Sequence, residues 1–171
     1  VVHEDDAAAY AQAVVNITRK VSATAALRAD YVHIPFRDEL DASNNGTSTY
    51  DRLSPFIGLT MNVSDDLRGF VAYKSAFRAP APLELACASP DAPCSLPSAL
   101  GADPALAPVV THDYEAGFDL DLPNRTSLDV DGFWTDVSND IVFAAPNLTQ
   151  VYFVNIPHSR RAGVELSAQT A

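Results

Sequence analysis

Apolar and polar residues alternate along most of the chain, which is the pattern of β-strands with two different faces. Between residues 112 and 122, Tyr, Ala, Phe and Leu at even positions alternate with Asp, Glu and Gly at odd positions. The same alternation runs through 21–33, 53–63 and 127–134, and more loosely through 8–17, 67–77 and about 151–170. The sequence therefore predicts seven strands.

The connections between these strands alternate in length. Short joins fall at 18–20, 64–66 and 123–124, and long ones at about 34–51, 78–111 and 143–150. Antiparallel strands threaded up and down place all short turns at one end of a sheet and all long loops at the other. Strands of ~10 alternating residues with short turns and long outer loops indicate a transmembrane β-barrel of the outer-membrane type.

The two predicted faces differ in chemistry. The apolar faces are rich in Ala, Leu and Val, and we expect aromatic residues near their strand ends, as in an interfacial girdle: Tyr10, Tyr31, Tyr73, Phe77, Tyr114 and Trp134. The other face carries acids that suit a water-filled lumen: Glu115, Asp119, Asp121, Asp129, Asp131 and Glu165. A soluble β-sandwich also alternates, so alternation alone does not separate the two folds. The asymmetry of loop length favours the barrel.

Composition excludes several functional classes. There are 22 acidic and 11 basic residues, a net charge of −11, which argues against binding nucleic-acid phosphate. No apolar run approaches the ~18 residues of a spanning helix, and no leader pattern opens the chain. Val1 and Ala171 both fall inside the pattern, so we expect a piece of a longer chain. No Ser/His/Asp set, nucleophile elbow or phosphate-binding glycine loop is present, which indicates a protein that is not an enzyme and needs no cofactor.

The connection 78–111 is long enough to suggest a function, since loops beyond roughly 12–15 residues are uncommon unless they bind something or are disordered. Pro80 and Pro82 remove ladder donors where the preceding strand ends. Cys87 and Cys94 lie seven positions apart within it, which favours a local disulfide and an oxidising compartment, with two free thiols as the alternative. The segment is either a ligand-contacting or gating loop, or a structural surface loop.

Four residues of the long loops are candidate ligand contacts: Arg37, Tyr50, Arg78 and Glu84. Arginine and aromatic side chains are common binding anchors, although Arg78 also suits an ion pair with a carboxylate of the lumen or a loop. The acids of the polar face lie along two neighbouring predicted strands. A hard metal needs oxygens that converge on one point, so a hydrated wall is the favoured interpretation and no metal site is predicted.

Five phrases of the sequence together resemble successive strands of TonB-dependent outer-membrane receptors. They are YAQAVVNIT (10–18), RLSPFIGLTMNV (52–63), FVAYKSAFRAPAPLEL (70–85), YEAGFDLDLPNRTSLDVDGFWTDVSNDIVF (114–143) and VNIPHSRRAGVELSA (154–168). The resemblance implies a 22-stranded barrel in the bacterial outer membrane, filled by an N-terminal plug. It also implies import of a scarce ligand, most often a ferric siderophore and sometimes cobalamin, haem or a glycan, driven by the partner protein TonB through the plug.

On this resemblance, residues 1–171 are about seven strands of the barrel, and the plug domain and the C-terminal strands lie outside them. Phe56 follows Ser54-Pro55 where relatives commonly carry Arg, which removes a lumen-facing cation. The acidic face is expected to pair with basic groups of the plug. Seven strands cannot close, and open edges in lipid leave backbone groups unpaired, so we do not expect the segment alone to transport. The alternatives are a secreted soluble β-sandwich for binding or adhesion, and a passive porin.

Overall fold

The computed structural model describes residues 3–37, 39, 45–85, 88, 106–123, 125–145 and 152–170. The strands are β1 (Asp5–Asn16), β2 (Val21–Phe36), β3 (Gly46–Asn62), β4 (Leu67–Arg78), β5 (Val109–Leu122), β6 (Thr126–Ala144) and β7 (Tyr152–Thr170). One short helix, α1 (Pro82–Leu85), follows β4. No helix among the described residues is long and apolar enough to cross a membrane.

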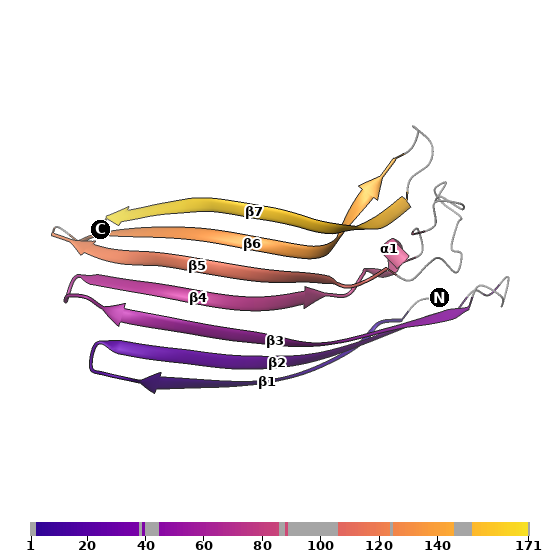
Figure 1. The fold of residues 1–171 in the computed structure, drawn as a ribbon, viewed down its shortest axis with the longest axis horizontal. Helices are drawn as coiled ribbons and strands as arrows, with labels where there is room; N and C mark the ends of the chain where they lie inside the picture. The colour runs from indigo at the N-terminus through magenta and orange to yellow at the C-terminus, as the bar shows by residue number, and fades with distance from the viewer. Residues whose placement is uncertain are drawn as a thin grey trace.

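The seven strands form one sheet in the order β1-β2-β3-β4-β5-β6-β7, and each strand is antiparallel to its neighbours (Figure 1). The turns after β1, β3 and β5 lie at one end of the sheet, which we call the turn end. Strands β2, β4 and β6 end at the opposite, long-loop end, where helix α1 also lies. The prediction of seven antiparallel strands threaded up and down is confirmed.

Several strands extend further than the sequence predicted. The β2–β3 ladder continues to the pair Phe36↔Gly46, so Tyr50 lies within β3 and not in a long loop, and the predicted loop 34–51 is wrong at both ends. Similarly, β5 begins at Val109 and not near His112. Backbone pairing continues there although the alternation of side chains has faded. Arg37 follows the last residue of β2, as predicted.

The apolar face of the sheet lies open. Its register brings Ile57, Tyr73, Tyr114 and Trp134 side by side across four strands. Large apolar side chains on this face are strongly exposed, for example Ile57 at 56% and Val164 at 76%. The described strands form a single sheet, so this face does not close against a second one, which rules out the dry interior of a β-sandwich.

On the apolar face, a row of aromatic residues is followed by a row of charged residues. The rings of Tyr73 and Tyr114 are 5.2 Å apart, and Trp134 is the next residue in register. In the following row toward the long-loop end, Arg160 forms an ion pair of 2.9 Å with Asp136 and covers the Trp134 ring at 4.4 Å. Aromatic residues followed by charges are the order found at a bilayer interface.

The polar face is defined by the alternate positions of the same strands. It carries basic residues on β2 to β4, including Arg28, Arg52 and Lys74, and the acidic residues of β5 to β7. Tyr10 lies opposite Arg28 and therefore on the polar face, so its predicted place in an apolar girdle is wrong. Phe56 also lies on this face, opposite Lys74.

A small hydrophobic core covers part of the polar face at the long-loop end. Its buried members come from β2, β3, α1 and the segments after α1 and before β5: Val32, Ile34, Tyr50, Leu85, Ala88 and Leu106. Ile141 of β6 and Phe153 of β7 pack against it. The described parts of the connection between β4 and β5 therefore lie across the sheet, from β2 and β3 to β6 and β7.

Candidate functional site

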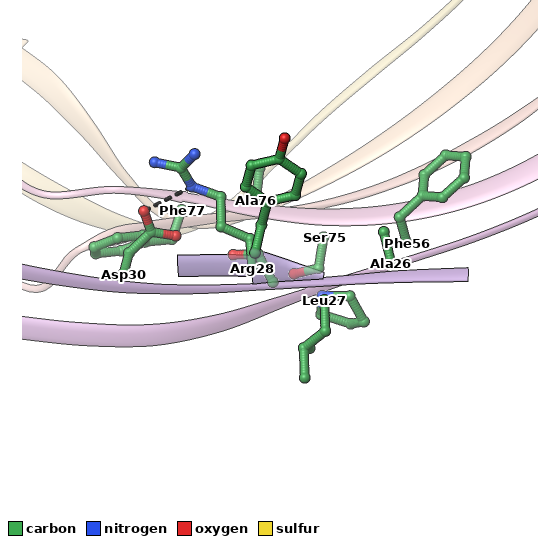
Figure 2. A pocket seen from close by; sticks show the side chains of 11 residues that line it. Ala26, Leu27, Arg28, Asp30, Phe56, Ser75, Ala76 and Phe77 are labelled. Carbon is green, nitrogen blue, oxygen red and sulfur yellow. Dashed lines mark hydrogen bonds and ion pairs between the residues drawn. The ribbon is translucent and has the colours of Figure 1, made fainter. Parts of the chain in front are cut away.

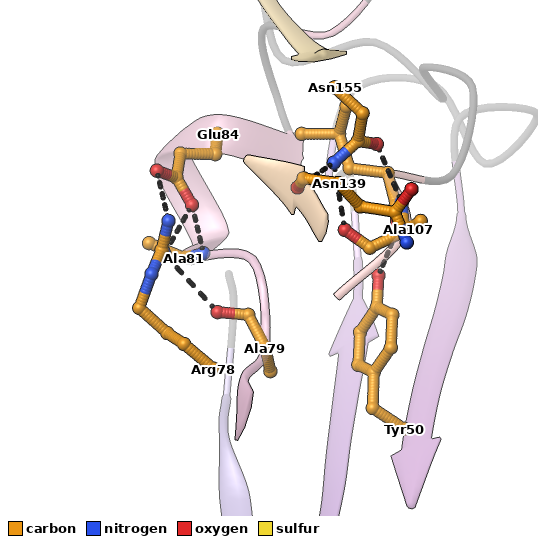
Figure 3. Close-up of polar contacts among 9 residues, drawn as sticks. Tyr50, Arg78, Ala79, Ala81, Glu84, Ala107, Asn139 and Asn155 are labelled. Carbon is orange, nitrogen blue, oxygen red and sulfur yellow. Dashed lines mark hydrogen bonds and ion pairs between the residues drawn. The ribbon is translucent and has the colours of Figure 1, made fainter. Parts of the chain in front are cut away.

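The start of the connection after β4 is held by an ion pair (Figure 3). Arg78 donates two hydrogen bonds to the carboxylate of Glu84, Nη1 to Oε2 at 2.7 Å and Nη2 to Oε1 at 3.1 Å. The Ala81 amide also donates to Glu84 Oε2 at 2.7 Å, just before the first residue of α1. Of the alternatives open for Arg78, the structure shows pairing with a loop carboxylate.

The end of the same connection is held by Asn155 of β7. Its side-chain amide accepts from the Ala107 amide at 2.8 Å and donates to the Ala107 carbonyl at 3.0 Å. The same Nδ2 donates to the carbonyl of Asn139 at 2.8 Å, where β6 takes a φ of 54°. Asn155 thus joins the entry into β5 to the bend of β6.

Tyr50 provides a second attachment at this point. Its hydroxyl donates to the carbonyl of Leu106 at 3.0 Å. Because Tyr50 is twelve positions before Asn62, it lies beyond the ~10 residues that span a bilayer from the turn end. Burial raises the pKa of the Tyr50 phenol, against a smaller lowering by a hydrogen bond with Ser48. The phenol therefore remains a hydrogen-bond donor at physiological pH.

Ion pairs across strands organise the middle of the polar face. Arg68 Nε contacts Asp119 Oδ2 at 2.8 Å, and Lys74 Nζ contacts Glu115 at 2.5 Å and Asp113 at 3.8 Å. In each pair a base of β4 meets an acid of β5. These partners are directly opposite or diagonal in register, so side chains on one face of a ladder meet.

Several acids of the polar face lie opposite one another in register. Asp119 is directly opposite Asp129, and Asp131 is directly opposite Glu165. Like charges in such positions are unfavourable, and the buried Oδ1 of Asp131 has no hydrogen-bond partner among the described residues. Within those residues, no group of three or more His, Cys, Asp or Glu is placed to hold a metal ion. The acids therefore form an extended charged surface that attracts cations.

The predicted site residues fall into three groups. Arg78, Glu84 and Tyr50 come together at the ends of one connection, and Arg37 lies at the end of β2 on the same end of the sheet. The acids Glu115, Asp119, Asp121, Asp129 and Asp131 share the polar face of β5 and β6. Cys87 and Cys94 lie outside the described residues, so their disulfide stays a prediction.

Sequence reasoning missed Asn155, Arg28 and Arg52. Asn155 sits in a strand with no motif around it, and its three partners are set by long-range packing. For Arg52 the local signal that could have pointed to a break in pairing is Pro55, three residues later in the sequence.

A single antiparallel sheet with an exposed apolar face, a charged opposite face, turns at one end and long connections at the other is a section of a transmembrane barrel wall. A family model described as TonB dependent receptor-like, beta-barrel, matches residues 1–171. The chain belongs to this family. TonB-dependent receptor barrels are proteins of the bacterial outer membrane, and they are transporters and not enzymes, as the sequence predicted.

Solved structures agree with the fold. The copper transporter OprC superposes with a TM-score of 0.79 at 16% identity, covering 98% of this chain and 26% of that one. A mutant of the Serratia marcescens hemophore receptor HasR, in complex with its hemophore HasA and heme, gives 0.73 at 19% identity, over 96% and 31% of the chains. The FrpB iron transporter of Neisseria meningitidis gives 0.70 at 18%, over 98% and 24%. The chain thus spans about a quarter to a third of these proteins, and no curated protein sequence matches it.

Proposed function

We propose that the chain is part of the barrel of an outer-membrane receptor that imports a chelated nutrient, a ferric siderophore above all, with energy delivered by TonB. The observation that carries this proposal is the family match over residues 1–171. The structural neighbours, whose names include a copper transporter, a hemophore receptor and an iron transporter, support the class of cargo.

In this proposal the barrel has 22 strands and the missing plug domain and C-terminal strands complete it. The acidic part of the polar face, including Asp129 and Asp131, then pairs with basic groups of the plug. TonB acts on the receptor through the plug, and the apolar face contacts outer-membrane lipid. No step involves bond chemistry, so the protein contributes shape and electrostatics.

The connection between β4 and β5 is the proposed ligand-contacting element. Arg78, Glu84 and Tyr50 fix its two ends, and its described parts lie over the polar face beside the core. A loop with fixed ends loses less conformational entropy when it closes over a ligand. Arg37 and the exposed half of Arg78 are the proposed contacts with an anionic chelate.

Uptake by whole cells tests the proposal. Cells that carry the full-length receptor are given a panel of radiolabelled ferric siderophores, with and without a functional TonB. The proposal expects uptake of at least one complex that stops when TonB is removed. A passive porin is the alternative, and it predicts uptake of small solutes that does not change without TonB. Uptake independent of TonB would contradict the proposed function.

A further inference from the structure

The sheet opens between β3 and β4. Their ladder ends at the pair Phe56↔Lys74, although β3 continues to Gly46 and β4 to Arg78. Pro55, the next residue of β3, has no backbone donor, so the ladder stops where a donor is missing. The opening holds a pocket of about 440 Å³ (Figure 2).

The pocket contains polar groups that lack partners. Ser75 is only 7% exposed, and its buried hydroxyl has no hydrogen-bond partner among the described residues. The buried hydroxyl of Ser54 also has no hydrogen-bond partner among the described residues. Both serines line the pocket. Buried polar groups are nearly always satisfied in native proteins, and the exceptions call for an explanation such as a bound group.

One arginine and one aspartate line the pocket. Arg28 contacts Asp30 through Nε at 2.7 Å, and the structure gives its terminal nitrogens no contact with Asp30 (Figure 2). Arg52 lies directly opposite Asp30 on β3, and its buried Nε has no partner among the described residues. Arg28 therefore contacts the carboxylate of Asp30, and a second arginine, Arg52, lies opposite Asp30 in register beside the pocket.

Apolar side chains complete the pocket. Phe56 lies on one side of the strands and Leu27 on the other (Figure 2), and Pro55 is opposite Leu27 in register. Phe77 closes the end near Asp30. Guanidinium and hydroxyl donors beside aromatic and aliphatic walls suit a molecule that has an anionic end and an apolar body.

We propose that this opening is a binding site for the carboxylate of a small organic acid. The planar fork of an arginine matches the two oxygens of a carboxylate, and Ser54 and Ser75 donate the further hydrogen bonds that it accepts. The organic body lies against Phe56 and the walls of the opening. The proposal deepens the proposed function and rests on it in one respect, that the polar face borders the lumen.

Ligand-observed NMR on the full-length receptor in nanodiscs tests the site, with benzoate, benzamide and inorganic phosphate as probes. Benzoate is expected to bind at least about tenfold more tightly than its neutral analogue benzamide, because a charge-assisted pair is worth that factor or more. Inorganic phosphate lacks the apolar body and is expected to bind more weakly than benzoate. Equal binding of benzoate and benzamide, equal binding of phosphate, or no benzoate binding at millimolar concentration would overturn the proposal.

Two variants and a control locate the site. Arg28→Gln, which removes the guanidinium that lines the pocket, is expected to weaken benzoate binding about tenfold, and Ser75→Ala, which removes only a hydroxyl, to weaken it severalfold. Arg68→Gln removes a cation of the same face outside the pocket, opposite Asn62, which is eight residues along β3 from Ser54, and it is expected to leave benzoate binding unchanged. If either pocket variant folds and binds benzoate as tightly as the wild type, the site is wrong. Because no TonB or uptake is involved, this result is separate from that of the uptake assay.

Discussion

The guanidinium of Arg78 and the carboxylate of Glu84 form two parallel hydrogen bonds, of 2.7 and 3.1 Å, at the point where β4 leaves the sheet. The same carboxylate accepts the Ala81 amide. The Glu84 carboxylate therefore contacts both the last residue of β4 and the amide just before α1. The pair is partly exposed, so its contribution to stability is local and of the order of an exposed ion pair.

Replacing Glu84 should loosen α1 selectively. Glu84→Ala removes the ion pair and the acceptor of the Ala81 amide, so amide hydrogen exchange across 81–85 in the full-length receptor should rise about fivefold, equivalent to about 1 kcal/mol. Glu84→Gln keeps an acceptor and should have a smaller effect. Leu83→Ala changes an exposed side chain of the same turn and serves as the control. Unchanged exchange in Glu84→Ala would show that the pair does not hold the turn.

Asn155→Ala should increase amide hydrogen exchange in two separate segments. The substitution leaves the amide and carbonyl of Ala107 and the carbonyl of Asn139 without their partner, at a cost of about 1–3 kcal/mol. Exchange should therefore increase at 106–109 and at 139–141 to a similar degree. Tyr50→Phe removes the bond to Leu106 and leaves Asn155 in place, so it should affect the first segment and not 139–141. An Asn155→Ala variant in which only one segment responds would contradict the bridging role.

Gly117 is expected to be irreplaceable by alanine. A Cβ there would lie 2.6 Å from the carbonyl oxygen of Val130 and would also clash with the carboxylate of Asp131 and the ring of Phe70. Since the backbone of β6 cannot move aside, Gly117→Ala should destabilise the barrel by about 1–3 kcal/mol. At Gly69 the nearest atom to a Cβ is 3.7 Å away, so Gly69→Ala is the control. Thermal unfolding of the two variants checks this, and equal stability would be the contrary result.

Much of the fold could be predicted from the sequence because the two faces of each strand have different environments. Where one face meets lipid and the other water, side chains alternate, as in 112–122. Toward the long-loop end both faces of the strands meet water or a local core, so the alternation fades there. The start of β3, which includes Tyr50, was therefore predicted to be a loop. The sequence therefore locates the spanning parts of strands better than their outer ends.

The site was less predictable because its contacts depend on register and on folding of the connection. Lys74 and Glu115 are 41 positions apart, and Tyr50 and Leu106 are 56 apart. Nothing local in the sequence specifies these partners. Pro55 could have signalled a break in pairing, but the unpartnered groups of Ser75 and Arg52 became evident only in the structure, where the ladder ends at Phe56↔Lys74.

Arginine substitutions on one strand should separate the two faces. Leu59 is an exposed residue of the apolar face, one row away from the aromatic row, and Leu59→Arg should cost about 2–4 kcal/mol if that row lies toward the middle of a bilayer. Thr60 lies on the polar face of the same strand, opposite Ser22 and Phe70, and Thr60→Arg should cost much less. Unfolding from bilayers by denaturant measures the difference, and equal costs would argue against lipid contact.

Collision accessibility of spin labels in the full-length receptor, reconstituted in a bilayer, tests the central claim most directly. Labels at Leu59 and Val71, opposite each other on the apolar face, should be relaxed by lipid-soluble oxygen and protected from a water-soluble nickel chelate. Labels at the adjacent positions Thr60 and Ala72 should not show this preference for oxygen. If all four labels respond alike, or if Leu59 and Val71 are protected from oxygen, the apolar face does not contact lipid and the barrel-wall interpretation is wrong.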